Sequence, residues 1–167
     1  MSEEVKASQG TKKKTSPYMK VMDDLSEFCS PKSKQLLGQI LTTLEATVDD
    51  ERKLEALRSR VKDIHWLTWE EMNQELWGSL DIFEKKDAYV DWESFMSRAV
   101  QAFLTKYGGV VQTLILAVFD DRRRASALNK EIIRLIYVTR DSIRRALSQI
   151  MASAFPVLSE KTEEEKK

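Results

Sequence analysis

The sequence predicts an all-α protein, a helical bundle of about five to seven helices, from its composition, its boundary residues and its apolar spacing. The 167 residues include only five glycines and three prolines, and 32% are charged, which is typical of helices rather than turn-rich sheets. Apolar residues recur every three or four positions through most segments between candidate boundaries. A chain of this length can bury a substantial core without disulfides or metals.

Several short motifs predict where helices begin. Ser16 and Ser30 each precede a proline, the arrangement of a serine N-cap with proline at the first helical position. Acidic residues 49–51 favour a further start, because they complement the positive end of a helix dipole. Residues 68–71 form a capping box, and Asp91 follows a short polar break as another candidate cap. Each motif predicts a separate helix.

The C-terminal part of the predicted domain has fewer boundary signals. Gly108 and Gly109 predict a helix stop, because glycine adopts the left-handed conformation without steric cost. Residues 110–155 contain neither glycine nor proline. We therefore expect either one long helix there or two helices interrupted near Asp120 and Asp121.

Composition divides the chain into three parts. Residues 1–15 combine small polar residues with the run Lys12, Lys13 and Lys14, and they hold too few apolar side chains to offset the entropy of ordering. We expect a flexible basic N-terminal arm at 1–15, a single helical-bundle domain at 16–156 and a charged, frayed tail at 157–167.

Cysteine usage and hydropathy indicate an intracellular protein, in the cytoplasm or nucleus. The single cysteine, Cys29, cannot form an internal disulfide, and the chain does not open with the charged and apolar regions of a secretory signal. The longest apolar run, residues 114–119, is far shorter than the roughly 20 residues that a membrane span needs, so no membrane partner is expected.

No catalytic apparatus is recognisable. His65 has no partner at metal-ligand spacing beyond Asp63, and Cys29 carries none of the local signatures of activated thiols. Gly108 and Gly109 lack the further glycines and the lysine of a phosphate-binding loop. We predict that the protein is not an enzyme, has no catalytic or metal-binding residues, and uses no cofactor or small-molecule substrate.

Charge is distributed unevenly although the net charge is zero. Residues 21–109 carry 11 basic and 17 acidic side chains, whereas residues 110–150 carry eight basic and four acidic ones. This asymmetry suits a polyanionic partner or head-to-tail self-association between acidic and basic faces. Scatter of charges over a solvated surface is the alternative.

Basic residues also recur at helical spacing in the C-terminal part. Arg123, Lys130, Arg134, Arg144 and Arg145 fall within an arc of roughly 100°, opposite an apolar side, if residues 122–150 form a helix. Arginine suits phosphate, because its planar fork can donate two hydrogen bonds to one group. The predicted nucleic-acid-binding residues combine the arm and this stretch: Lys12, Lys13, Lys14, Arg122, Arg123, Arg124, Lys130, Arg134, Arg144 and Arg145. There are two alternatives: these basic residues only form a solvated face, or they pair with an acidic protein surface.

All four tryptophans lie within 27 residues of one another, at Trp66, Trp69, Trp77 and Trp92. Large aromatic side chains dominate protein cores, so the cluster can pack one end of the bundle. Tryptophan is also enriched at interface hot spots, so the same four residues are candidates for a partner-binding surface.

The segment Val110–Arg124, in which an apolar run leads into Phe119, Asp120 and three arginines, resembles part of the helical coat proteins of rod-shaped plant viruses. Residues 140–146 resemble a later helix of that family, and the basic arm is similar to filamentous-virus coats generally. The resemblance covers about 35 of the 167 residues, and the long loop that the family places between these elements is missing. It implies arginines that contact RNA phosphates, assembly into a nucleoprotein, and location in a virion.

These observations predict a non-enzymatic, self-assembling helical protein of coat or nucleoprotein type. It would contact the phosphate backbone of DNA or RNA without sequence preference and form homo-oligomers. The alternative is an intracellular interaction adaptor that docks a partner through its tryptophan-rich half. An enzyme of unrecognised type is the third possibility.

Overall fold

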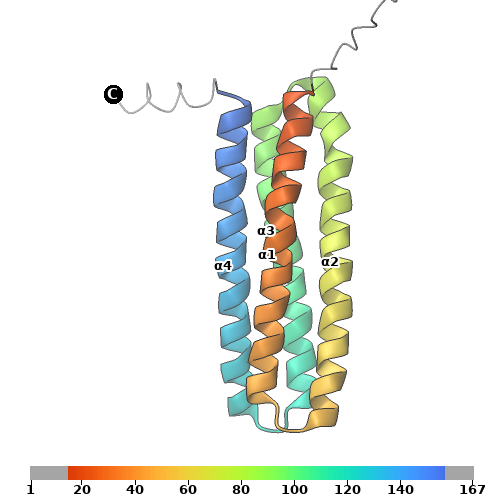
Figure 1. Cartoon of the computed structure of the whole chain (residues 1–167), viewed down its shortest axis with the longest axis vertical. Coiled ribbons are helices and arrows are strands. Elements are labelled where there is room, and N and C mark those ends of the chain that lie inside the picture. Colours follow the sequence, from red (N-terminus) through yellow and green to blue (C-terminus); the bar gives the residue numbers. More distant parts are fainter. Residues whose placement is uncertain (1–14, 157–167) are drawn as a thin grey trace, which may run out of the picture.

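A computed structural model describes residues 15–156 as four long helices (Figure 1). They are α1 (Pro17–Thr47), α2 (Glu51–Lys86), α3 (Tyr89–Val118) and α4 (Arg122–Ala154). The prediction of an all-α bundle is confirmed, but the number of helices was overestimated. The arm residues Lys12, Lys13 and Lys14 and the predicted tail at 157–167 lie outside the described residues.

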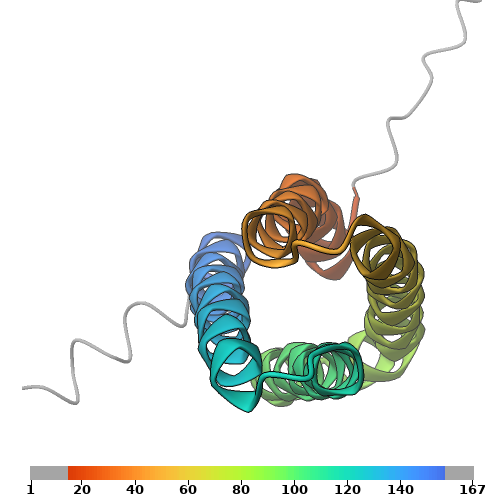
Figure 2. The same ribbon diagram turned by 90° about the horizontal axis from the view of Figure 1, so that it is seen from below.

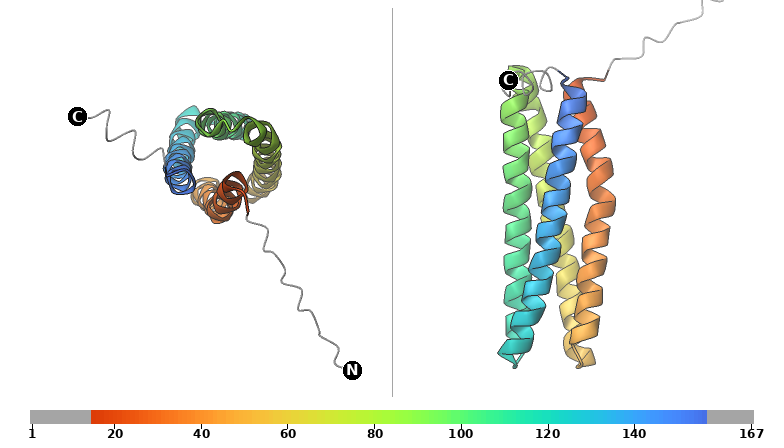
Figure 3. Two further views of the ribbon diagram at one scale, coloured as in Figure 1. Left: turned by 90° about the horizontal axis from the view of Figure 1, so that it is seen from above. Right: turned by 90° about the vertical axis from the view of Figure 1, so that its left-hand side faces the viewer.

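The four helices pack side by side around a common core, and each is antiparallel to the next. Connections of two or three residues join them, which forces successive helices to be neighbours. Contacts also join α1 to α4, so the helices form a ring in which α2 lies diagonally opposite α4 (Figures 2 and 3). No helix of the described part combines the length and apolarity needed to cross a membrane.

Two of the predicted helix starts are confirmed, and the structure decides between the two alternatives for residues 110–155. The Ser16 hydroxyl accepts a hydrogen bond from the Met19 amide at 3.1 Å, and Asp50 accepts two amide bonds at the start of α2. The chain breaks at Asp120 and Asp121, and the Asp121 carboxylate caps α4. Residues 110–155 therefore belong to two helices rather than one.

The start predicted at Ser30 is wrong, because α1 continues through Pro31. Proline there has no N–H for the Glu27 carbonyl, which costs roughly 3 kcal/mol in a helix interior. The buried stripe nevertheless keeps its spacing across it, from Leu25 and Cys29 to Leu36. Burial on both sides of the proline holds the helix together.

The capping box at 68–71 is also a wrong prediction, because it lies in the middle of α2. Thr68 and Trp69 are buried rather than positioned at a helix end. The side chain of Glu71 pairs with Lys106 of α3 at 2.6 Å instead of reaching back to an N-terminal amide.

The boundaries predicted in the third helix need two corrections. The polar break is real, and Asp87 adopts the left-handed conformation there, but α3 begins at Tyr89 and Asp91 lies in its first turn. Gly108 and Gly109 do not stop the helix, which continues to Val118. A β-carbon on Gly108 would lie 3.1 Å from the Ile136 Cδ1 atom, so this glycine allows α3 and α4 to approach closely.

Aromatic side chains close the end of the bundle where α1 begins and α4 ends. Tyr18 packs between Trp92 and Phe155 with ring centroids 5.1 and 5.0 Å away, and Phe155 stacks on Tyr89. The indole N–H of the buried Trp92 donates to the Ser79 hydroxyl at 2.8 Å, which joins α3 to α2.

A polar pair lies inside the core between α1 and α2. The Ser33 Oγ and His65 Nε2 atoms are 2.8 Å apart, and His65 is fully buried against the rings of Trp69 and Tyr107. Burial penalises the imidazolium and lowers the pKa of His65 from 6.5 to about 4. His65 is therefore a neutral core residue at pH 7.

We expect opposite responses to alanine at the two adjacent glycines. Gly109→Ala should raise the free energy of unfolding by about 0.5–1 kcal/mol, because a β-carbon there meets no atom within 4 Å and alanine is the better helix former. Gly108→Ala should gain less or lose stability, since Ile136 must move. Urea unfolding of both variants tests this, and equal gains would contradict the close α3–α4 contact.

His65 should make the bundle sensitive to acid. Its pKa is lower in the folded state than in the unfolded chain, so the unfolded chain takes up a proton first as the pH falls below 6.5. The resulting loss of stability is roughly 3 kcal/mol by about pH 4. Unfolding free energies of the wild type and His65→Gln, measured between pH 7 and pH 4, should differ in slope. Parallel slopes would show that His65 does not carry this effect.

Candidate functional site

The basic residues of α4 project from the outer side of the bundle. The seven that the sequence singles out are all exposed: Arg122, Arg123, Arg124, Lys130, Arg134, Arg144 and Arg145. The opposite side of α4 is buried through Ile132, Ile136 and Ile143, as the periodicity predicts. Five of the cations share one side of α4, namely Arg123, Lys130, Arg134, Arg144 and Arg145, whereas Arg122 and Arg124 lie at its two edges.

Two of these cations are already paired within the protein. The Arg134 guanidinium forms a fork with the Glu131 carboxylate, with N–O distances of 2.6 and 3.0 Å, and this hydrogen bonding lowers the pKa of Glu131 and raises that of Arg134. Arg124 donates to the Thr47 carbonyl at 2.7 Å and to Asp49 at 2.9 Å, which ties α4 to the α1–α2 connection. Neither guanidinium is fully available for a phosphate.

The other cations lack a carboxylate partner among the described residues. The side chains of Arg122, Arg123, Lys130 and Arg144 make no hydrogen bond or ion pair with residues 15–156, and Arg145 donates only to the Asp141 carbonyl. Their charge is therefore available to a ligand.

The two ends of the α4 face differ in electrostatics. Arg122 and Arg123 lie at the end of the bundle that also holds Asp49, Asp50, Asp120 and Asp121, which line a shared hollow with Lys53 and Arg124. Carboxylates there oppose an approaching phosphate. Arg144 and Arg145 lie two or more turns beyond Glu131, beside a groove that holds two carboxylates, Glu93 and Asp141.

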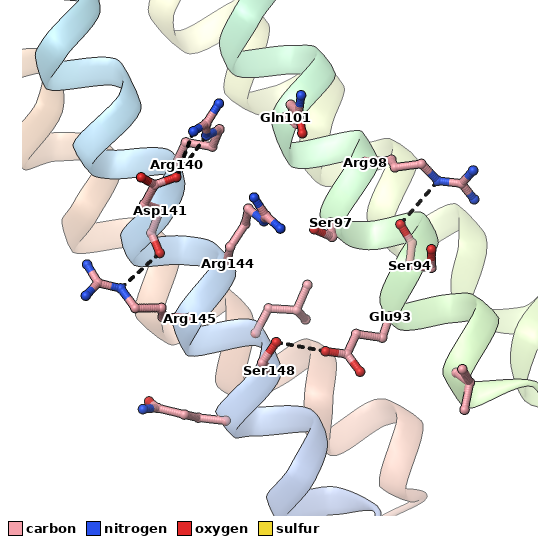
Figure 4. A pocket seen from close by; sticks show the side chains of 13 residues that line it. Glu93, Ser94, Ser97, Arg98, Gln101, Arg140, Asp141, Arg144, Arg145 and Ser148 are labelled. Atoms are coloured by element: carbon pink, nitrogen blue, oxygen red, sulfur yellow. Dashed lines mark hydrogen bonds and ion pairs between the residues drawn. The ribbon is translucent and has the colours of Figure 1, made fainter. Parts of the chain in front are cut away.

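A groove of about 1240 Å³ separates α3 from α4 near Arg144. Four arginines line it, three from α4 and one from α3: Arg140, Arg144, Arg145 and Arg98. Figure 4 shows Arg144 pointing from α4 into the space between the helices, whereas the guanidinium groups of Arg98 and Arg145 point away from that space. Two carboxylates, Glu93 and Asp141, share the groove, so positive charge is in excess.

Hydrogen bonds position most of the groove-lining groups. Arg140 donates from two nitrogens to one Asp141 oxygen, at 3.0 and 2.9 Å, and Arg98 donates to the Ser94 carbonyl at 3.3 Å. Glu93 accepts from Ser148 at 2.9 Å. The walls are fixed and partly neutralised, and the free guanidinium of Arg144 stands between them.

The chemistry of this arrangement suits an anionic ligand. A guanidinium flanked by hydroxyl and amide groups, such as those of Ser97 and Gln101, can donate several hydrogen bonds to phosphate oxygens. The sequence did not predict Arg98 or Arg140 as site residues. Arg98 lies more than 40 residues from Arg144 within the acidic part of the chain, so only the α3–α4 packing brings it to the groove.

The four tryptophans divide into two pairs. Trp69 and Trp92 are buried, so a partner cannot reach them on the folded protein. Trp66 and Trp77 are 50% and 38% exposed on α2, and eleven residues separate them, which places both on one side of the helix. Only this second pair can form a contact surface.

Other reactive groups of the described residues lie in the core. Burial raises the pKa of the Cys29 thiol to about 12, so the thiolate is absent near pH 7. No three histidine, cysteine or acidic side chains among residues 15–156 come together in a way that could hold a metal ion.

The chain matches no protein-family model, no curated protein and no solved structure.

Proposed function

We propose that this protein binds nucleic acid through the phosphate backbone, without sequence preference, along the outer side of α4 and the α3–α4 groove. The observation that carries the proposal is the unpaired Arg144 guanidinium inside a groove that three further arginines line. The groove-lining arginines can neutralise phosphates, and contacts to phosphates carry no sequence information.

Three further features support a coat-like role. Unpaired cations extend from Lys130 to Arg145, a distance of roughly 23 Å along the helix axis, which is enough for several phosphates of one strand. The resemblance of residues 110–124 to helical virus coat proteins fits the same role. Lys12, Lys13 and Lys14 lie outside the described residues and would add phosphate contacts from the arm.

The proposal predicts a specific change in salt dependence. Binding of the chain to a mixed-sequence oligonucleotide should be detectable at about 50 mM salt and weaken steeply as salt rises, because each phosphate contact releases counterions. Arg144→Gln combined with Arg145→Gln should flatten the plot of log affinity against log salt by about 1.5 units, at roughly 0.7–0.9 units per contact. Fluorescence anisotropy across a salt series measures this.

Two control variants separate local contact from overall charge. Lys85→Gln with Lys86→Gln removes the same charge from the exposed last turn of α2 and should leave the slope unchanged. Glu131→Gln with Arg134→Gln removes an internal pair without changing the net charge. If the Arg144 and Arg145 variant behaves like either control, or if the wild type does not bind, the proposed function is wrong.

We also propose that copies of the chain associate through the outer side of α2. Trp66 and Trp77 are exposed there, and residues 70–84 include five acidic side chains and no basic one. The cationic face of α4 lies diagonally across the bundle. A contact between the α2 side of one copy and the α4 side of the next would be heterologous, the type of contact that builds open chains rather than closed dimers.

Trp66→Ser combined with Trp77→Ser should therefore reduce self-association and leave the fold intact, since both side chains are exposed. Sedimentation over a concentration series measures the effect, and Leu67→Ser, an exposed residue on the flank of this side, is the control. A wild type that is monomeric at all concentrations would exclude self-association. The exposed tryptophan pair would then favour the second candidate function, an adaptor that docks a different protein.

A further inference from the structure

A small, mostly apolar hollow lies beside Tyr137, next to the arginine-lined groove. This hollow has a volume of about 170 Å³, several times the roughly 30 Å³ that one water occupies in the liquid. Ile133 and Ile136 of α4 line it, together with Gly108 and Gly109 of α3. Arg140 lines both the hollow and the cationic groove, so the two are adjacent.

The glycines explain why the hollow is open on the α3 side. Gly108 allows the two helices to approach, and a β-carbon on Gly109 would meet no atom within 4 Å. No side chain from these two positions covers Tyr137, whose surface is 51% exposed. An aromatic side chain of this size that stays half exposed beside an apolar hollow is available for stacking.

Arg140 holds the Tyr137 ring from one side. Its guanidinium lies 4.7 Å from the ring centroid, and Asp141 fixes that guanidinium through two hydrogen bonds. The ring and the guanidinium form a rigid support. Because the Arg140 charge is already shared with Asp141, its part in binding is to position the ring.

We propose that the ligand of this groove is single-stranded nucleic acid, with one base stacked on Tyr137 at the hollow and the neighbouring phosphates at Arg144. The inference rests on the proposed phosphate-binding function and adds the class of nucleic acid. Tyr137 and Arg144 are two helical turns apart, about 10 Å along the axis, so one strand can reach both. A duplex hides its base faces within the stack, so only an unpaired base can lie on the ring.

The test compares three labelled ligands of equal length at one salt concentration: a single strand, the same strand without bases, and a duplex. The single strand should bind about tenfold more tightly than the abasic strand, since stacking of a base on an aromatic side chain is sequence-tolerant and favourable. Tyr137→Leu should remove that preference without changing affinity for the abasic strand, and Tyr137→Phe should retain it. Val138→Ala, an exposed neighbour outside the hollow, is the matched control.

The outcomes separate this inference from the function on which it rests. Equal affinity for the strand with and without bases, or tighter binding of the duplex, would overturn the stacking inference. If binding of these ligands still weakened steeply with salt, the proposed phosphate binding would stand. A Tyr137→Leu variant that weakens binding of the abasic strand equally would assign the ring a structural role and also overturn it. Failure to bind any of the three ligands would overturn both.

Discussion

One constraint determines the rest of the structure: each helix buries a single apolar stripe along its whole length. The stripe of α1 beyond Pro31 includes the buried Leu36, Ile40 and Leu44, and each such side chain contributes roughly 1.5–3 kcal/mol. A helix break at the proline would turn this stripe away from the core. The cost of an interior proline, about 3 kcal/mol, is smaller than that loss, so α1 remains continuous. At Gly108 and Gly109 too, the cost of glycine in a helix interior, at most about 1 kcal/mol each, is smaller than the loss that a helix break would cause by turning the rest of the apolar stripe away from the core.

Once the apolar stripes face the core, the sequence and the order of the helices around the ring determine which charged side chains lie on each outer side. Because α2 and α4 lie on a diagonal, their acidic and cationic sides face away from each other and cannot pair within one copy. Pairing inside the chain then decides which cations are available: Glu131 and Asp49 occupy Arg134 and Arg124, whereas Arg144 has no such neighbour. Arg122 and Arg123 at the other end of α4 are also unpaired, but Asp120 and Asp121 lie beside them, and these carboxylates distinguish that end from the α3–α4 groove.

Sequence reasoning predicted the helical class, the cap residue Ser16, the acidic helix start at residues 49–51, and the cationic side of α4. It failed where a local motif competed with a longer pattern. The capping box at 68–71 and the glycine pair are valid boundary signals, but the buried stripe passes through both without a change of spacing, from His65 to Met72 and from Leu104 to Val111. The groove could not be predicted, because Arg98 and the hollow beside Tyr137 depend on which helices are neighbours. The order of the helices around the ring depends on how they pack together, and the residue pattern of one helix does not determine it.

Zero net charge does not prevent the proposed binding, and the reason lies in distance. Neighbouring helices pack 8–10 Å apart, so diagonal axes are separated by roughly 13 Å, and outward side chains by more. The Debye length at physiological salt is about 8 Å, so the acidic side of α2 is screened from a phosphate at the α4 side, whereas Arg144 acts on it at contact distance. A protein without net charge can therefore present a polyanion-binding face, provided that the opposing charge lies across the bundle. Four helices in a ring give that separation, which a side-by-side placement of α2 and α4 would remove.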